Sequence, residues 1–481
     1  MGLLQRIFNW KRDYEEAYEV EEWNEIVYDR DDLQVHNRKQ REEYVRGCLE
    51  QIAEASREVE NLQHEYQVVT SHLKDIEEIE ALPENESRLL MECAKRIDTL
   101  EGQQSGYKER KNRMTDEKFY QMECMEEEVQ EAYEKLEKAE EFIFLEYFII
   151  NSGHMWDSVL DVLRRKVAQG VDVRVIYDDV GCADYLPANY CQTLRSYGIK
   201  AMVFNKFVPV VSVVMNNRDH RKITVIDGKV GFIGGINISD EYINKKERFG
   251  HWKDTGLMFK GPGVENLTIM FLEMWNAFEE KEGGYRDFVP AEYEEKGGEG
   301  DGYILSFSDS PLDDENASEN VYADILYNAN DYVYITTPYL AIDSSLQNAL
   351  CLAAKRGVDV RLITPGIPDK KMVYRLTRSY YASLIRAGVK IYEYTPGFVH
   401  AKSYVADDKI GVVGTINMDY RSLYLHFECG TLMYDSPAVI DLRNDDLATI
   451  EKCRKIELSD CRTSFFGELI DRVLRVIAPL L

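Results

Sequence analysis

Two stretches decide the fold: HRKITVIDGKVGFIGGIN at residues 220–237 and HAKSYVADDKIGVVGTIN at residues 400–417. In both, a lysine follows the histidine by two residues, an aspartate by seven, a glycine by fourteen and an asparagine by seventeen. One short match of this kind is a weak signal in a chain of this size. Two matches with the same extended spacing indicate an internal duplication, so the sequence predicts two lobes of one design.

The segments before the motifs are duplicated as well. In each copy an aromatic and β-branched run, FIFLEYFII or YVYITTPYL, precedes a helical segment and then the tetrapeptide VDVR. Gly170 and Gly357 stand just before VDVR, where a helix ends in the left-handed conformation that suits glycine. Strand–helix–strand alternation predicts parallel strands covered by helices. We therefore expect an α/β fold with mixed or parallel sheets flanked by helices.

The two predicted lobes occupy residues 126–296 and 297–481, joined at the Gly- and Glu-rich stretch 294–302. Residues 1–125 follow another pattern, because apolar residues from Val45 onward recur at alternating spacings of three and four between charged flanks. This pattern is typical of a coiled coil. We predict an N-terminal α-helical coiled-coil extension that carries no chemistry and offers a surface for homo-oligomer formation.

Composition excludes several functions. The 481-residue chain has a formal net charge of -28. This charge argues against a nucleic-acid partner, because a protein that binds nucleic acid needs a basic surface. Its nine cysteines form no C-x-x-C pair, which argues against a zinc ribbon or thioredoxin motif and fits reduced cytoplasmic thiols. No apolar run approaches the ~18–20 residues that span a bilayer. No phosphate-binding G-x-x-x-x-G-K-[ST] loop is present.

The duplicated motifs predict one shared catalytic pocket. Residues i and i+2 of a strand share a face, so each histidine projects together with its lysine. Two facing copies supply two imidazoles, two ammonium groups and two amides, which suit a phosphodiester. One imidazole attacks phosphorus while the other protonates the leaving alkoxide, giving a covalent phosphohistidine intermediate. The candidate residues are His220, Lys222, Asp227, His400, Lys402 and Asp407 as catalytic groups, with Asn237 and Asn417 as phosphate-binding groups.

Carboxylates complete the predicted site. Asp254 in HWKDTGL and Glu428 in HFECGTL follow the two motifs at corresponding places and are candidates to orient the histidines. The sequence leaves open which carboxylate holds which histidine. For the two motif aspartates the alternative is a structural role in closing the turn after the strand. Glu146 is a candidate pocket residue, with a carboxylate satisfied within its strand as the alternative. A lysine two residues from each histidine opposes a bound cation, so we expect neither a metal nor a cofactor.

At these residues the chain resembles the phospholipase D superfamily and, within it, bacterial cardiolipin synthases. The resemblance covers about residues 128–481 and includes FIFLEYFIINSGHMW, NNRDHRKITVIDGKVGFIGGINISDEY, FVHAKSYVADD and VVGTINMDYRSLYLHFE. It implies two phospholipase D-type lobes and transfer of a phosphatidyl group from one phosphatidylglycerol to another, with release of glycerol. It further implies His220 as the nucleophile and His400 as the acid and base.

The same resemblance implies a phosphatidylglycerol substrate and a membrane surface as partner. With no spanning segment visible, the expected location is peripheral, at the cytoplasmic face of a bacterial membrane. Two alternatives stay open at this point. One is a phosphodiester hydrolase of the same superfamily, either a phospholipase D or a nuclease. The other is a coiled-coil scaffold protein that carries inactive lobes.

Overall fold

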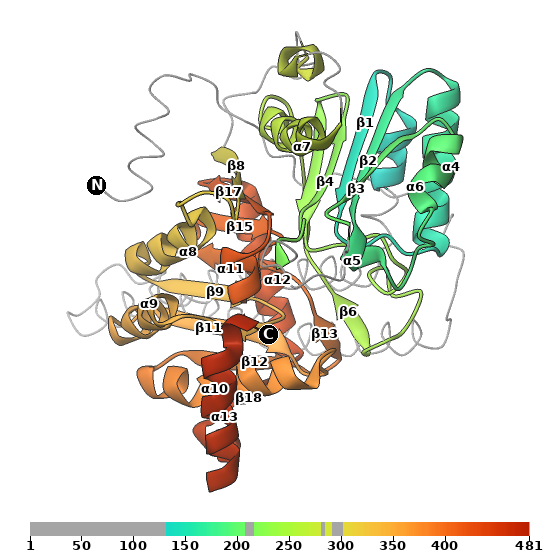
Figure 1. Ribbon diagram of the computed structural model, residues 1–481. Coiled ribbons are helices and arrows are strands. Elements are labelled where there is room, and N and C mark those ends of the chain that lie inside the picture. Colours follow the sequence, from blue (N-terminus) through green and yellow to red (C-terminus); the bar gives the residue numbers. More distant parts are fainter. Residues whose placement is uncertain (1–130, 207–215, 280–283, 291–301, 481) are drawn as a thin grey trace, which may run out of the picture. The chain divides into compact units, whose positions relative to one another are not determined.

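A computed structural model describes residues 131–206, 216–279, 284–290 and 302–480 (Figure 1). The predicted coiled-coil extension and nearly all of the predicted join at 294–302 lie outside these residues. The described chain is a mixed α/β structure whose sheets are flanked by helices, as the sequence predicts. None of its helices is long and apolar enough to cross a membrane.

The first sheet has six strands in the order β3-β2-β1-β4-β5-β7. β1, β2 and β3 are parallel, as the strand–helix–strand alternation predicts, whereas β4, β5 and β7 add antiparallel strands beyond β1. The sheet is therefore mixed. Its strands are β1 (Phe142–Tyr147), β2 (Asp172–Asp178), β3 (Lys200–Phe204), β4 (Lys222–Ile226), β5 (Val230–Gly234) and β7 (Gly256–Lys260).

Helices cover both faces of this sheet (Figure 1). Side chains of β1 alternate between the faces, because successive residues of a strand point to opposite sides. Phe144 stacks on Phe271 of α7 with ring centroids 4.5 Å apart, while Leu145 joins the core cluster that holds Trp156 of α4. The helices of this lobe are α4 (His154–Ala168), α5 (Asp179–Cys182), α6 (Tyr190–Ser196), α7 (Val264–Phe278) and the 3-10 turn η4 (Tyr285–Phe288).

The second sheet repeats the plan with eight strands in the order β18-β12-β11-β9-β14-β15-β17-β8. Again β9, β11 and β12 are parallel, and the motif strands β14 and β15 run antiparallel. The strands are β8 (Tyr303–Asp309), β9 (Tyr332–Thr336), β11 (Asp359–Pro365), β12 (Lys390–Tyr394), β14 (Ser403–Ala406), β15 (Ile410–Gly414), β17 (Glu428–Tyr434) and β18 (Cys453–Ile456).

Helices flank the second sheet too. α9 and α10 contribute to the large core cluster on one face, and α12 packs on the other. Gly170 and Gly357 follow α4 and α9 with φ of 93° and 99°, the left-handed conformation the sequence predicts for them. The helices are α8 (Ala317–Asn328), α9 (Ser344–Lys355), α10 (Lys371–Ala387), α11 (Tyr420–Tyr424), α12 (Pro437–Glu451), α13 (Phe465–Ile477) and the turns η5 (Leu458–Cys461) and η6 (Ala478–Leu480).

Backbone pairing joins the two sheets and positions the site. β6 (His251–Lys253), after the first motif, pairs in parallel with β13 (Gly397–Val399), before the second. On the other side Asp219, just before the first motif, forms a parallel bridge with Phe427. A further short pair links β10 (Leu340–Ala341) to β16 (Met418–Asp419) within the second lobe. One hydrophobic cluster contains residues of both α7 and α12, so the lobes also share a core.

Candidate active site

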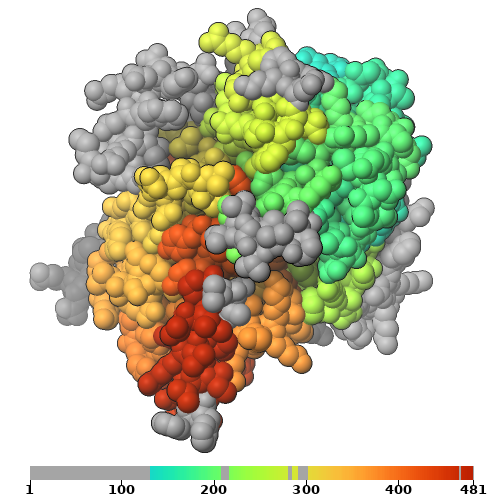
Figure 2. All heavy atoms as spheres, viewed as in Figure 1, coloured from blue at the N-terminus to red at the C-terminus, as the bar shows by residue number. Residues whose placement is uncertain are grey.

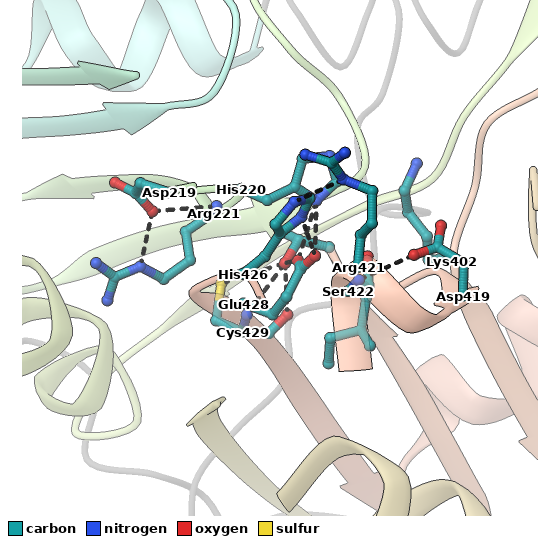
Figure 3. Close-up of polar contacts among 12 residues, drawn as sticks. Asp219, His220, Arg221, Lys402, Asp419, Arg421, Ser422, His426, Glu428 and Cys429 are labelled. Carbon is teal, nitrogen blue, oxygen red and sulfur yellow. Dashed lines mark hydrogen bonds and ion pairs between the residues drawn. The ribbon is translucent and has the colours of Figure 1, made fainter. Parts of the chain in front are cut away.

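His220 enters the site from the backbone bridge between the lobes. Its N–H donates to the carbonyl of Phe427 at 2.9 Å, and the N–H of Phe427 donates to the carbonyl of Arg218 at 2.9 Å. Glu428 is the next residue after Phe427, so its side chain reaches the imidazole. The Nδ1 of His220 lies 2.9 Å and 3.1 Å from the two carboxylate oxygens of Glu428 (Figure 3).

His400 is placed by the same arrangement with the lobes exchanged. Its N–H donates to the carbonyl of Lys253 at 2.7 Å. Asp254, the residue after Lys253, lies with Oδ2 2.7 Å from the Nδ1 of His400. The question left open by the sequence is therefore answered by geometry. Each histidine contacts a carboxylate from the opposite lobe: Glu428 is on His220 and Asp254 on His400.

The two motif lysines lie beside their histidines and are almost fully buried. Lys222 Nζ donates to the carbonyl of His220 at 2.5 Å. Lys402 Nζ donates to the carbonyl of His400 and lies 2.8 Å from its Nδ1. Burial lowers the pKa of Lys222 to about 8 and that of Lys402 to about 7. Both ammonium groups are therefore held in a dry setting, where a charge acts strongly on a bound anion.

The electrostatics tie both halves into one site. Burial, and then the charge of Lys222, hold the pKa of His220 well below its ordinary value, and Lys402 and His400 of the other lobe lower it further. Burial and the charge of Lys402 lower the pKa of His400 to about 4, with Lys222 acting across the lobes. The two histidines and two lysines therefore lie close enough to influence one another across the lobes.

The two orienting carboxylates differ in their surroundings. Burial raises the pKa of Glu428 well above its ordinary value. For Asp254 burial also acts to raise the pKa, but His400, Lys402 and the N–H of Thr255 at 2.9 Å outweigh it and leave the pKa lowered. Asp254 is thus firmly ionised, whereas Glu428 needs additional stabilisation to carry its charge.

The two motif asparagines are both buried but have different partners. The side chain of Asn237 is occupied, because its amide nitrogen donates to the hydroxyl of Tyr242 at 2.7 Å and its oxygen accepts from the N–H of Ile149 at 3.0 Å. The side-chain oxygen of Asn417 has no hydrogen-bond partner among the described residues. Asn417 is therefore the better placed of the two to contact a ligand.

The motif aspartates do not join the histidines. The carboxylate of Asp227 accepts the backbone N–H groups of Glu140, Glu141 and Phe142 at 2.8–2.9 Å, at the beginning of β1. Asp407 does the same for residues 330–332 at the beginning of β9, at 2.7–2.9 Å. Their φ angles of 53° and 54° close the turns after the motif strands. For both aspartates these contacts support the structural alternative that the sequence left open.

Glu146 is fully buried in an ion pair with Arg221, whose Nε also lies 3.1 Å from Asp219. Burial raises the pKa of Glu146 well above its ordinary value, and Arg221 acts against that shift. No hydrogen bond joins Glu146 to His220 or His400 in the described chain. Its described contact is the ion pair with Arg221, although neither of its oxygens has a hydrogen-bond partner among the described residues.

Two residues of the site were missed by sequence reasoning. Thr415 Oγ1 donates to Oε2 of Glu428. His426 is a third buried imidazole, with its ring centroid 5.5 Å from that of His220. Ligand atoms of His220, His426 and Glu428 lie within 4.8 Å of one another. The signal for His426 was its place two residues before Glu428, on the same face of the chain, but the other copy has tryptophan there.

The comparisons with known proteins agree with this geometry. The family model described as "Cardiolipin synthase, PLD-like domain" matches residues 114–255 and 322–445. A cardiolipin synthase of Geobacillus thermodenitrificans is 37% identical over 354 residues, 73% of this chain and 69% of that protein. An uncharacterized protein of Streptococcus mutans serotype c is 51% identical over 353 residues, 73% of this chain and 76% of that protein.

The class defined by fold and site is that of two-lobed phospholipase D-like proteins. Phosphatidylserine synthase of Haemophilus influenzae Rd KW20 shares the fold, with a TM-score of 0.56 at 15% identity over 73% of this chain and 91% of that one. Within the class, the chain belongs to the cardiolipin synthase family. It is an enzyme of the cardiolipin synthase type, a transferase of phospholipid synthesis.

Proposed function

We propose that the enzyme makes cardiolipin by transferring a phosphatidyl group from one phosphatidylglycerol to a second, with release of glycerol. The observation that carries the proposal is the crossed pair of contacts, His220 to Glu428 and His400 to Asp254. Two imidazoles, each oriented by a carboxylate through Nδ1, leave both Nε2 atoms for chemistry on one phosphodiester. The cardiolipin synthases among its relatives support the choice of lipid.

In the first half-reaction the Nε2 of His220 attacks phosphorus, and the bond from phosphorus to the glycerol oxygen breaks. The negative charge of the bound diester raises the pKa of His400 from its low value in the empty site, so that this imidazole carries the proton. His400 gives that proton to the departing glycerol. The phosphatidyl group remains on His220 as a phosphohistidine, whose positive charge faces Glu428.

In the second half-reaction the hydroxyl of another phosphatidylglycerol replaces glycerol. His400, now neutral, takes the proton of this hydroxyl while its oxygen attacks phosphorus and the bond to His220 breaks. Cardiolipin leaves, and both histidines return to their initial protonation states. Two inversions give retention at phosphorus. One phosphodiester is exchanged for another, so the reaction needs no nucleotide.

The buried cations stabilise the transferring group. Lys222 and Lys402 lie beside the two histidines, where their charges oppose the negative charge that builds up on the non-bridging oxygens. The side chain of Asn417, whose oxygen has no hydrogen-bond partner among the described residues, supplies a further polar contact. These groups are fixed by burial before the substrate arrives, which lowers the reorganisation needed in the transition state.

The experiment uses purified protein with phosphatidylglycerol liposomes and resolves the lipid products by mass spectrometry. Cardiolipin and an equal amount of glycerol are expected, and neither His220→Ala nor His400→Ala is expected to form them. Phosphatidic acid as the main product would replace the proposal by the hydrolase alternative, since water then accepts the phosphatidyl group. Cardiolipin formation by either variant at the rate of the parent enzyme would exclude the site.

We also propose that the enzyme binds the cytoplasmic face of the membrane peripherally, through α13. One face of this helix packs on the core with Leu474 and Ala478, 6% and 2% exposed. The opposite face presents three apolar residues at helical spacing: Leu469, Val473 and Val476, exposed by 53%, 52% and 79%. α13 lies on the surface (Figure 2), and its continuation η6 contacts α11, the helix just before His426. An apolar face near the site fits a lipid surface.

Liposome flotation tests this docking face. Serine at Leu469, Val473 and Val476 together is expected to reduce binding to phosphatidylglycerol liposomes while activity on a short-chain soluble analogue persists. Serine at Leu312 and Leu352, which are also exposed but lie on other elements, is the matched control. Unchanged flotation of the α13 variant would exclude this face. Oligomer formation through the coiled coil concerns residues outside the described ranges and stays a prediction.

A further inference from the structure

The two half-sites differ at one pair of equivalent positions. His426 precedes Glu428 by two residues, and Trp252 precedes Asp254 by two. Both side chains are buried, with 8% and 7% of their residues exposed. Each lies beside its catalytic histidine, with ring centroids 5.5 Å and 5.4 Å apart. An indole cannot exchange a proton with the site, whereas an imidazole can donate to it or accept from it. The indole of Trp252 has only an N–H donor, which is also buried without a hydrogen-bond partner among the described residues, so the His220 half-site has a titratable ring that the other lacks.

The contacts of His426 define its protonation. Arg421 donates through Nε to the Nε2 of His426 at 3.3 Å, so in the neutral ring the proton is on Nδ1. Burial lowers the pKa of His426 well below its ordinary value, which keeps the ring neutral. Nδ1 has no hydrogen-bond partner among the described residues and lies 3.6 Å from Oε1 of Glu428. Figure 3 shows the rings of His220 and His426 both directed toward this carboxylate.

A buried donor without a partner is uncommon and costs free energy. Here the missing partner is close, because a closure of about 0.8 Å brings Nδ1 of His426 to the distance of a charge-assisted hydrogen bond. The pKa of Glu428 stays raised by burial although Thr415 donates to it, whereas that of Asp254, which receives the N–H of Thr255, is lowered. Thr415 supports Oε2 of Glu428, while Oε1 faces His220 and His426.

We propose that His426 is a positioning residue of the His220 half-site, whose Nδ1–H closes onto Oε1 of Glu428 when that carboxylate becomes fully charged. This step coincides with phosphohistidine formation and so rests on the proposed function. The charge on the phosphorylated ring calls for an ionised Glu428, and a donor from His426 stabilises that ionised form. Thr415 and His426 then hold the two oxygens from both sides. The half-site with this third imidazole is the one that carries the covalent intermediate.

His220, His426 and Glu428 lie close enough together to hold a metal ion. Their surroundings are positively charged, which favours a role in hydrogen bonding and proton transfer over metal binding. Nε2 of His426 already accepts from Arg421, and the ammonium group of Lys222 acts on both His220 and His426. Arg218 and Lys370 add further positive charge around the ring of His426. A divalent cation would have to enter among these cations, which raises its free energy. Chelation with EDTA is therefore expected to leave the activity of the parent enzyme unchanged.

Two substitutions separate the donor from the ring. His426→Asn keeps a donor near the position of Nδ1, and His426→Phe fills the space without one. For His426→Phe we expect kcat to fall about tenfold to a hundredfold, the worth of a hydrogen bond to a charged group, with KM little changed. The activity loss on the acid side of its pH–rate profile is expected to move to higher pH, because Glu428 then binds a proton more readily. His426→Asn is expected to restore most of kcat and to return the acid side of the pH–rate profile to its position in the parent enzyme.

Trp252→Phe is the matched control at the equivalent position, and the acid side of its pH–rate profile is expected to stay in place. An activity-independent readout is the apparent pKa of His220 from NMR of ¹⁵N-histidine-labelled protein. It is expected to fall in His426→Phe, because a less charged Glu428 stabilises the imidazolium less, and to return in His426→Asn. This readout tests the inference even if the parent makes no cardiolipin, an outcome that would overturn the proposed function instead. The inference is overturned if His426→Phe shows the parent kcat and His220 pKa. It is also overturned if EDTA abolishes activity and zinc restores it.

Discussion

Replacement of Glu428 by glutamine tests the role of the crossed carboxylates. The substitution keeps the size of the side chain and removes its charge. Glu428 contacts Nδ1 of His220 at 2.9 Å and 3.1 Å and is completely buried. The phosphohistidine carries a positive charge, which lies about 4 Å from the centre of the carboxylate charge. With an effective dielectric constant of about 20, this interaction contributes about 4 kcal/mol.

That energy corresponds to a loss of about a thousandfold in kcat, since about 1.4 kcal/mol changes a rate tenfold. An amide also permits the wrong tautomer of His220, which brings the expected loss toward about ten-thousandfold. The assay is steady-state cardiolipin formation from phosphatidylglycerol by mass spectrometry. KM is expected to change little, because the carboxylate acts on the covalent step and not on lipid binding.

Glu146→Gln is the matched control, a buried carboxylate on the first lobe without a hydrogen bond to the catalytic histidines. Its kcat is expected to stay near that of the parent, although its stability falls. The reasoning is refuted if Glu428→Gln keeps kcat within about tenfold of the parent, a loss of no more than about 1.4 kcal/mol. Equal losses of kcat in the two variants would refute it as well, because burial of a carboxylate would then explain the effect.

Three further predictions follow from the contacts. Asp227→Ala removes the acceptor of three backbone N–H groups, so urea unfolding should show a free energy of unfolding lower by about 2–3 kcal/mol, while the folded enzyme keeps its kcat. A large loss of kcat without destabilisation would instead support a catalytic role for Asp227. Arg221→Met leaves Glu146 buried without its cation and should lower the free energy of unfolding by about 3–5 kcal/mol in the same urea experiment. An unchanged urea midpoint would contradict the ion pair. Burial lowers the pKa of Lys402 to about 7, so kcat/KM should fall as the pH rises through 7–8 and the ammonium group loses its proton; a profile flat to pH 9 would contradict this.

Much of the fold was readable from local pattern. The helix ends at Gly170 and Gly357 and the parallel strands around them follow from backbone preferences and hydrophobic spacing, which are properties of neighbouring residues. The antiparallel strands of each sheet were not evident from the sequence. Their direction depends on the path of the connecting segments, which no local pattern specifies. The pairing of β6 with β13 joins residues far apart in the sequence, and no local signal specifies it.

The site was predicted to the extent that it is duplicated. His220 and His400 stood out because matched spacing made chance implausible, and Asp254 and Glu428 because each follows its motif at a corresponding place. Which carboxylate contacts which histidine depends on contact between the lobes. Asp227 was grouped with the catalytic candidates because it belongs to the motif, and the sequence could not show that its carboxylate accepts the backbone N–H of Phe142 at the beginning of β1. His426 was missed since duplication reveals only what the copies share, and its equivalent is a tryptophan.

The most direct test of the central claim, that the histidines act as nucleophile and acid at one site, uses a phosphatidyl ester of p-nitrophenol. This leaving group needs no proton, so His400→Ala is expected to release one equivalent per site in a burst and then stall. Peptide mapping after an alkaline quench should place a phosphatidyl group on His220. His220→Ala should give no burst and no adduct. A burst from His220→Ala, or an adduct on His400, would contradict the account.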